Sequence, residues 1–265
     1  MGRRPELGES QLGTTAHAAL HDDTGGTVTE ELFRADAYAV RCDALVTAVG
    51  PAGIELNRTV FYPLGGGQPG DTGMLRLASG RSLRIIDTRK GTQPGQILHI
   101  PEPHEADVTV GEPLHAEIDW GRRYRMMRVH TCLHLLSAVI TAWVTGGSIR
   151  DGTGRLDFDL PESNLEKEAV TRRLNALIEA DHSVSVRWIS DDELAARPDL
   201  VRTMSVKPPM GQGRVRLLDI AGVDLQPCGG THVRRTGEIG PIRVTKIEKK
   251  GKHNRRVEIA LVAEG

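Results

Sequence analysis

The chain has 265 residues, which is enough for one large domain or two ordinary ones with a buried core. Its formal net charge is −1 at pH 7, so a protein that is basic over its whole surface is excluded, and any contact with nucleic acid must use local patches. Its three cysteines do not form a disulfide framework, which favours a reducing, cytoplasmic setting. No apolar run approaches the ~18 residues of a membrane span and no signal peptide is visible, so no membrane partner is expected.

The first 120 residues divide into two parts. Residues 1–26 are rich in Gly, Thr, Asp and His without apolar periodicity, which predicts a disordered extension. From residue 27 to residue 120 the pattern is one of short apolar runs separated by Gly and Pro. Closely spaced strands of this kind predict a small β-barrel or roll. The expected strands are residues 42–49, 54–61, 82–86, 96–100 and 114–118.

Residues 121–265 mix helical and strand periodicity. Residues 163–166 and 190–193 read as capping boxes, each opening a helix. An earlier helix is expected around His130 and His134, with its core side formed by Leu133, Leu136, Ile140 and Trp143. The fold class is therefore α+β, a small N-terminal β-barrel followed by a domain of helices on a largely antiparallel sheet. Its strands are expected at residues 155–159, 184–188, 215–220, 242–247 and 257–262.

Four residues in two short pairs have the spacing of metal ligands. His130 and His134 lie four apart, so on a helix they share a face with their Cβ atoms roughly 5–6 Å apart. Cys228 and His232 are also four apart, with two glycines between them that let the backbone bend. Such a His/Cys set suits zinc better than magnesium or calcium, and we expect one zinc per chain.

Other chemistries of these residues stay open at this point. Cys228 could be a nucleophile paired with a histidine, although metal ligation accounts for all four residues more economically. Thr131 stands where a zincin has its general-base Glu, which disfavours metalloprotease chemistry. Three ligands plus water would make a catalytic site and a closed set of four a structural one.

The glycine-rich run of residues 58–73 contains Gly65, Gly66, Gly67 and Gln68 in sequence. It has neither the Gly-Lys-Ser/Thr ending of a P-loop nor the Gly-x-Gly-x-x-Gly spacing, so no nucleotide cofactor is expected. From the residues alone the run is either a long turn or a segment whose backbone amides approach a ligand closely.

Together these segments resemble a known family. Residues 58–73, the His130/His134 pair, Cys228-Gly-Gly-Thr-His232 and residues 236–240 are similar to the editing region of alanyl-tRNA synthetases, and most of all to the freestanding AlaX proteins of medium length. The resemblance covers residues 27–262, and no aminoacylation core precedes it. It implies a trans-acting hydrolase that deacylates mischarged tRNA(Ala), chiefly Ser-tRNA(Ala), with Gly-tRNA(Ala) as a second candidate.

Carried over residue by residue, the resemblance implies zinc ligation by His130, His134, Cys228 and His232. Thr59 and the segment Gly65-Gly66-Gly67-Gln68 match the part that lies near the editing pocket, so Thr59 and Gln68 become candidate catalytic residues. The Thr59 hydroxyl is our candidate for bonding the serine hydroxyl, although a β-branched strand residue is an equal alternative. The general base is then a water, a substrate hydroxyl or Asp224, and Asp224 could also be a simple turn carboxylate.

Two basic clusters are candidate contacts for tRNA phosphates, or else solvated surface. Two further function classes remain alongside the editing hydrolase. A zinc-stabilised RNA-binding module would bind without turnover, and a zinc hydrolase of small esters or amides would act without tRNA. The candidate contacts are Arg122, Arg123, Arg125 and Arg128 in one cluster, with Lys246, Lys249, Lys250, Lys252, Arg255 and Arg256 in the other.

Overall fold

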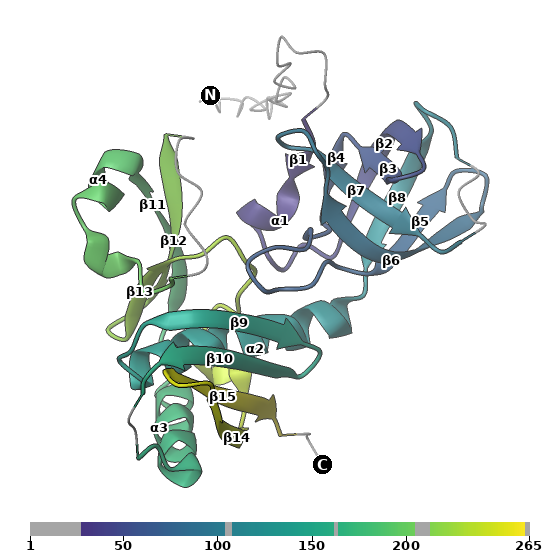
Figure 1. The fold of residues 1–265 in the computed structure, drawn as a ribbon. Helices are drawn as coiled ribbons and strands as arrows, with labels where there is room; N and C mark the ends of the chain where they lie inside the picture. Colours follow the sequence, from purple (N-terminus) through teal and green to yellow (C-terminus); the bar gives the residue numbers. More distant parts are fainter. Residues whose placement is uncertain (1–27, 104–107, 162–163, 205–212, 263–265) are drawn as a thin grey trace, which may run out of the picture.

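The computed structural model describes residues 28–103, 108–161, 164–204 and 213–262. The expected extension, residues 1–26, lies outside the described residues. In Figure 1 the barrel lies to one side of helix α2 (Trp120–Val139), while two further sheets flank the same helix. Within the described parts of the chain, no helix is both long enough and apolar enough to cross a membrane.

Six antiparallel strands close the N-terminal barrel in the order β2-β3-β7-β6-β5-β8. Inward side chains such as Ile54, Leu75 and Ile85 alternate with exposed ones, because successive residues of a strand point to opposite faces. A short parallel pair of β1 (Glu30–Glu31) and β4 (Arg58–Thr59) lies outside the barrel beside α1 (Leu32–Ala35). The barrel strands are β2 (Arg41–Gly50), β3 (Gly53–Leu56), β5 (Gly73–Leu77), β6 (Ser82–Lys90), β7 (Ile97–Pro101) and β8 (Pro113–Ile118).

The predicted barrel is confirmed, with two differences in its strands. The expected strand of residues 54–61 is broken at Asn57, whose side-chain oxygen accepts a hydrogen bond from the Leu45 amide and turns the chain. Strand β5 was not predicted, because it begins at Gly73, the last residue of the glycine-rich run, and its five residues show only weak alternation.

Helix α2 forms the centre of the second part. Asp119 caps its N-terminus by accepting a hydrogen bond from the Arg122 amide, and the helix is buried on most of its circumference. Its apolar side chains share one core with the four-stranded antiparallel sheet β14-β15-β10-β9 and with α3 (Lys167–Glu179). The sheet is made of β9 (Val144–Arg150), β10 (Thr153–Asp159), β14 (Ile242–Lys250) and β15 (Asn254–Leu261).

A smaller sheet carries one half of the candidate ligands. It has the order β11 (Val184–Ser190), β12 (Arg214–Ile220), β13 (Asp224–Pro227), all antiparallel. One face is covered by α4 (Asp191–Ala195) and the 3-10 turn η1 (Pro198–Leu200), which place Leu194 and Leu200 against Val215 and Leu217. A second 3-10 turn, η2 (Thr236–Ile239), follows the ligand loop.

The predicted α+β class is confirmed, and three local predictions need comment. The capping box of residues 190–193 is present and opens α4. The box of residues 163–166 is wrong, since α3 begins at Lys167 with Glu166 as an N-cap that makes no side-chain bond, and Ser163 lies outside the described residues. Trp143 is also wrong as a core residue: α2 ends at Val139, and the Trp143 side chain is 54% exposed. Strands β9 and β13 were not predicted.

Candidate metal centre

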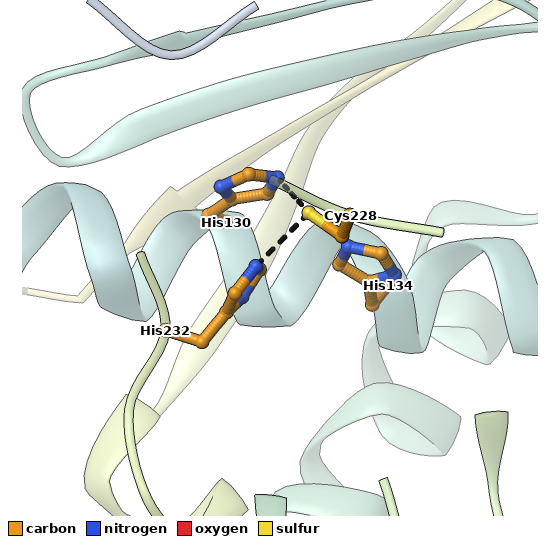
Figure 2. Close-up of side chains that lie close together, drawn as sticks. All are labelled: His130, His134, Cys228 and His232. Atoms are coloured by element: carbon orange, nitrogen blue, oxygen red, sulfur yellow. Dashed lines mark hydrogen bonds between the residues drawn. The ribbon is translucent and has the colours of Figure 1, made fainter. Parts of the chain in front are cut away.

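The four predicted ligands come together from two elements (Figure 2). His130 and His134 lie one turn apart on the same face of α2, as their spacing predicts. Cys228 and His232 lie in the loop that leaves β13 and passes over that face. All four donor atoms lie within 4.8 Å of one another.

The geometry of the donor set fits a zinc ion. The Sγ atom of Cys228 is 3.1 Å from Nε2 of His232 and 3.6 Å from Nε2 of His130. Tetrahedral ligands at usual zinc distances are about 3.5 Å from one another. The three histidines are buried, and imidazole nitrogen and thiolate sulfur are both ligands that zinc accepts. No other cluster of this kind occurs in the described parts of the chain.

Gln68 fixes the tautomer of His130. Its Oε1 accepts the Thr231 backbone N–H at 3.2 Å, and its Nε2 donates to the Thr231 hydroxyl at 2.8 Å, so the amide orientation is determined by its partners. The same Oε1 lies 3.0 Å from Nδ1 of His130, which must therefore carry the proton. The Nε2 lone pair of His130 is left facing the other donors.

Asp224 holds His134 in the same way. Its Oδ2 lies 3.2 Å from Nδ1 of His134, and its two oxygens also accept from Nε2 of Gln226 at 2.9 Å. Arg202 lies 3.4 Å from the other oxygen. The carboxylate group is fully buried, so it orients the ligand and cannot reach a substrate. This argues against the predicted role of Asp224 as a general base.

Thr131 supports the third histidine. Its hydroxyl donates to the Met127 carbonyl at 2.9 Å and therefore accepts from Nδ1 of His232 at 3.2 Å. Each of the three histidines thus has a partner at Nδ1 and presents Nε2 to the centre, an arrangement typical of metal-ligating histidines. In the sequence, Thr131 was notable only because it occupies the position where a zincin has its Glu. In the structure it orients a candidate metal ligand, His232.

Charges within the centre favour the ligand forms of two residues. Burial alone would raise the pKa of the Cys228 thiol, but interactions with the imidazoles of His130, His232 and His134 hold it well below its usual value. Burial, together with the neighbouring imidazole of His130, lowers the pKa of His232 to about 3, so its imidazole is neutral. Burial opposes protonation of His134, yet the Cys228 thiolate and Asp224 raise its pKa to about 10.

The glycine-rich run delivers Gln68 to the centre. Gly67 has a φ of +83° and its carbonyl accepts from the Ile149 amide of β9 at 2.9 Å. A Cβ atom at Gly67 would lie 3.2 Å from the carbonyl oxygen of Gly147, and one at Gly230 would lie 2.3 Å from Cε1 of His130. The glycines thus allow close contacts with other parts of the protein, while the predicted approach of backbone amides to a ligand stays a prediction. Gly65 pairs with Gln68 in a short bridge.

Thr59 is not part of the centre's surface. Its side chain is fully buried, and its hydroxyl lies 2.8 Å from Nε2 of His99 and accepts from the Phe61 amide. Nδ1 of His99 donates to the Ile54 carbonyl at 3.0 Å, so Nε2 is the acceptor and the only Thr59 proton is used there. This placement argues against the predicted bond between Thr59 and a serine hydroxyl.

The predicted basic clusters differ in their accessibility. The guanidinium of Arg123 is fully buried and is bonded to Asp71 and to the carbonyls of Ala37 and Val60, which argues against the predicted contact with RNA. Arg122 is partly exposed and donates to the Gly70 carbonyl at 2.8 Å. The side chains of Lys249, Lys250 and Lys252 are exposed around the turn between β14 and β15.

Two arginines near Cys228 were missed by the sequence reasoning. Arg216 of β12 donates from Nη1 to the carbonyls of Cys228 and Gly230, at 2.6 and 3.1 Å. Arg34 of α1 reaches the Gly229 carbonyl at 3.4 Å. No local pattern in the sequence marks either residue as part of the site. Arg216, for example, alternates with apolar residues like any arginine in a strand.

Two family models match parts of the chain. The model described as tRNA synthetases class II (A) matches residues 32–122, and that of the threonyl and alanyl tRNA synthetase second additional domain matches residues 215–258. The second match includes Cys228 and His232. The first match includes the barrel and the glycine-rich run.

Whole proteins are also similar to the chain. It is 36% identical to the alanyl-tRNA editing protein AlaX-M of Methanosarcina mazei, over 89% of this chain and 97% of that protein. It is 34% identical to AlaX-M of Saccharolobus solfataricus, over 87% of this chain and 98% of that protein. The alanine–tRNA ligase of Sulfurisphaera tokodaii is 30% identical over 83% of this chain, but only 25% of the ligase is covered. The chain therefore belongs to the AlaX-M family of alanyl-tRNA editing proteins.

Proposed function

We propose that the protein is a zinc-dependent aminoacyl-tRNA deacylase that acts in trans on mischarged tRNA(Ala), in the cytoplasm where charged tRNA is used. Serine is the chief amino acid removed, and glycine is the second candidate. The observation that carries the proposal is the convergence of three Nε2 atoms on the Cys228 thiolate, each with its Nδ1 bonded elsewhere. Membership of the AlaX-M family supplies the substrate class.

The reaction is hydrolysis of the ester between the amino acid and a ribose hydroxyl of the terminal adenosine. A bound zinc would supply Lewis acidity to a water or to the substrate. Gln68, Asp224 and Thr131 keep the ligand imidazoles in one orientation, so little reorganisation is needed when substrate binds. Since the Asp224 carboxylate is buried and bonded, the proton acceptor is a water or a substrate hydroxyl.

Deacylation assays with and without a chelator test this proposal. The wild-type protein should hydrolyse Ser-tRNA(Ala), spare Ala-tRNA(Ala) and leave a free seryl ester intact, and a chelator should abolish the activity. His134→Ala should lose both metal and activity. His115→Ala is the matched control, because His115 lies on the barrel, is partly exposed, and contacts Asp43 at 2.9 Å. Full activity in metal-free protein would contradict the zinc requirement.

The same assays separate the two other function classes. Metal content and tRNA binding without hydrolysis would identify an RNA-binding module. Hydrolysis of the free seryl ester at a rate equal to that of Ser-tRNA(Ala) would identify a hydrolase of small esters.

The basic turn between β14 and β15 is proposed as a contact for tRNA phosphates. Lys249, Lys250 and Lys252 are exposed there, and Lys250 is paired with Glu248, at 2.9 Å on the surface. Replacing all three lysines by Gln should weaken tRNA binding and lower the salt slope by about 1 per lost phosphate contact. A matched triple Gln variant of exposed residues on α3, with unchanged affinity, is the control. Its positions are Lys167, Arg172 and Arg173.

A further inference from the structure

A row of three residues crosses the smallest sheet and ends at the candidate metal centre. Trp188 of β11 lies opposite Arg216 of β12, and the Cys228 amide donates to the Arg216 carbonyl at 3.1 Å. Residues directly opposite one another in antiparallel strands point to the same face of the sheet. The side chains of Trp188 and Arg216 therefore lie on the same face as the candidate metal ligand Cys228. With strands ~4.8 Å apart, Trp188 lies ~10 Å from Cys228.

The middle residue of the row is a buried cation with an unused donor. Arg216 is only 8% exposed, and its Nη1 is bonded to two backbone carbonyls of the ligand loop. Its Nε is buried and has no hydrogen-bond partner within the described residues. Buried donors are almost always bonded, so this N–H indicates a position for an acceptor from a ligand, preferably an anion.

The outer residue of the row is an exposed aromatic ring. Trp188 is 46% exposed, and the guanidinium of Arg214 lies 4.6 Å from its ring centroid. Val186, two residues earlier on the same face, is exposed as well. The opposite face of this sheet has its own cover of apolar side chains from α4 and η1. Trp188 is therefore not needed for the core, and an indole beside arginine is a surface on which unpaired bases stack.

We propose that this row binds the single-stranded 3′ end of the charged RNA. The aminoacyl ester lies at the metal centre, Arg216 Nε donates to the phosphate next to the terminal nucleoside, and a base further from the end stacks on Trp188. The ~10 Å from Cys228 to Trp188 corresponds to two or three nucleotides at the ~3.4 Å rise of stacked bases. This inference rests on the proposed function, since it uses the ester's position, but its test needs no turnover.

The test compares two exposed tryptophans by equilibrium binding. The probes are uncharged tRNA(Ala) and the same tRNA trimmed of its 3′-terminal nucleotides. Trp188→Ala should weaken binding of intact tRNA on the order of 10-fold, the effect of losing one stacked base, and leave the trimmed tRNA unaffected. Trp143→Ala is the matched control, because Trp143 is similarly exposed but lies outside this sheet, and it should bind both probes like the wild type.

A second pair of variants tests the arginine. Arg216→Lys keeps the positive charge but removes Nε and the Nη1 bonds to the ligand loop, so it should weaken binding of intact tRNA several-fold, and zinc content is measured on the same preparation. Arg187→Lys is its control, because Arg187 precedes Trp188 on the same strand, points to the other face and pairs with Asp219 at 2.6 Å. Unchanged zinc content shows that the ligand loop has kept its shape.

The outcomes separate this inference from the proposed function. Wild-type affinity of Trp188→Ala for intact tRNA would overturn the inference, and so would an equal loss of affinity for both probes. If the wild type deacylates Ser-tRNA(Ala) while Trp188→Ala binds normally, only the binding row is refuted. If the wild type binds the 3′ end through Trp188 but never deacylates, only the proposed function is refuted.

Discussion

Replacing Asp224 by Asn should lower the affinity for zinc without unfolding the protein. The substitution keeps the size of the side chain but removes its negative charge. In the wild type, Asp224 accepts from His134 Nδ1 and from Gln226 Nε2, and it lies beside Arg202. An Asn can offer only one oxygen to these donors, and its amide group must then face a second donor.

The expected loss follows from the position of Asp224. The loss of a partner that orients a metal ligand typically costs 10–100-fold in metal affinity or activity. We expect the upper part of this range, since the carboxylate is fully buried and faces a donor on each side. Seryl-tRNA deacylation should fall in parallel when zinc is limiting and recover in part when zinc is in excess.

Zinc affinity should be measured by competition with a chromogenic chelator, with thermal unfolding as the check on folding. Asp219→Asn is the matched control: Asp219 lies on the neighbouring strand β12, points to the other face and pairs with Arg187. This control should bind zinc like the wild type. Wild-type zinc affinity in Asp224→Asn would refute the assignment of Asp224 as the group that orients His134.

Three other predictions concern the barrel side of the site. Gln68→Leu removes the acceptor of a ligand imidazole and should weaken zinc binding on the order of 10-fold in the same chelator competition. Burial lowers the pKa of His99 to about 4, below the ~6.5 of the unfolded chain, so the folded protein keeps this imidazole neutral. Its contribution to the free energy of unfolding is complete above pH 6.5 and is lost as the pH falls toward 4. Wild-type stability in urea should therefore drop over this range by on the order of 3 kcal/mol more than that of His99→Asn, and parallel curves would contradict this. Arg123→Met leaves the buried Asp71 unpaired and should cost on the order of 3–5 kcal/mol in urea unfolding, whereas breaking the exposed Arg125 pair should cost ~1 kcal/mol or less.

The ligand pairs could be read from the amino-acid sequence because their geometry is local. A spacing of four on a helix places His130 and His134 on one face whatever the rest of the fold does. The two glycines between Cys228 and His232 likewise indicated a tight loop. Strand alternation and Gly/Pro punctuation were enough for the barrel and the α+β class.

The partners of the ligands were decided by tertiary structure alone. Gln68 reaches His130 across 62 positions of the chain, and Asp224 reaches His134 across 90. Both contacts exist because the glycine-rich run and strand β13 lie against α2. The spacing of residues along the sequence does not predict this arrangement. From the sequence, Asp224 was one of several candidate bases or a simple turn carboxylate, and Gln68 was a candidate catalytic residue.

Burial also depended on packing between distant segments. Arg123 read as a surface charge next to other arginines, yet it lies against Asp71 inside the protein. Thr59 read as a pocket hydroxyl, yet His99 on another strand takes its proton. A residue's type and spacing determine which bonds it can make, whereas the packing of remote segments determines which partner is present and whether water can reach it. For that reason the donor set of this centre was predictable, and the groups that orient it were visible only in the folded chain.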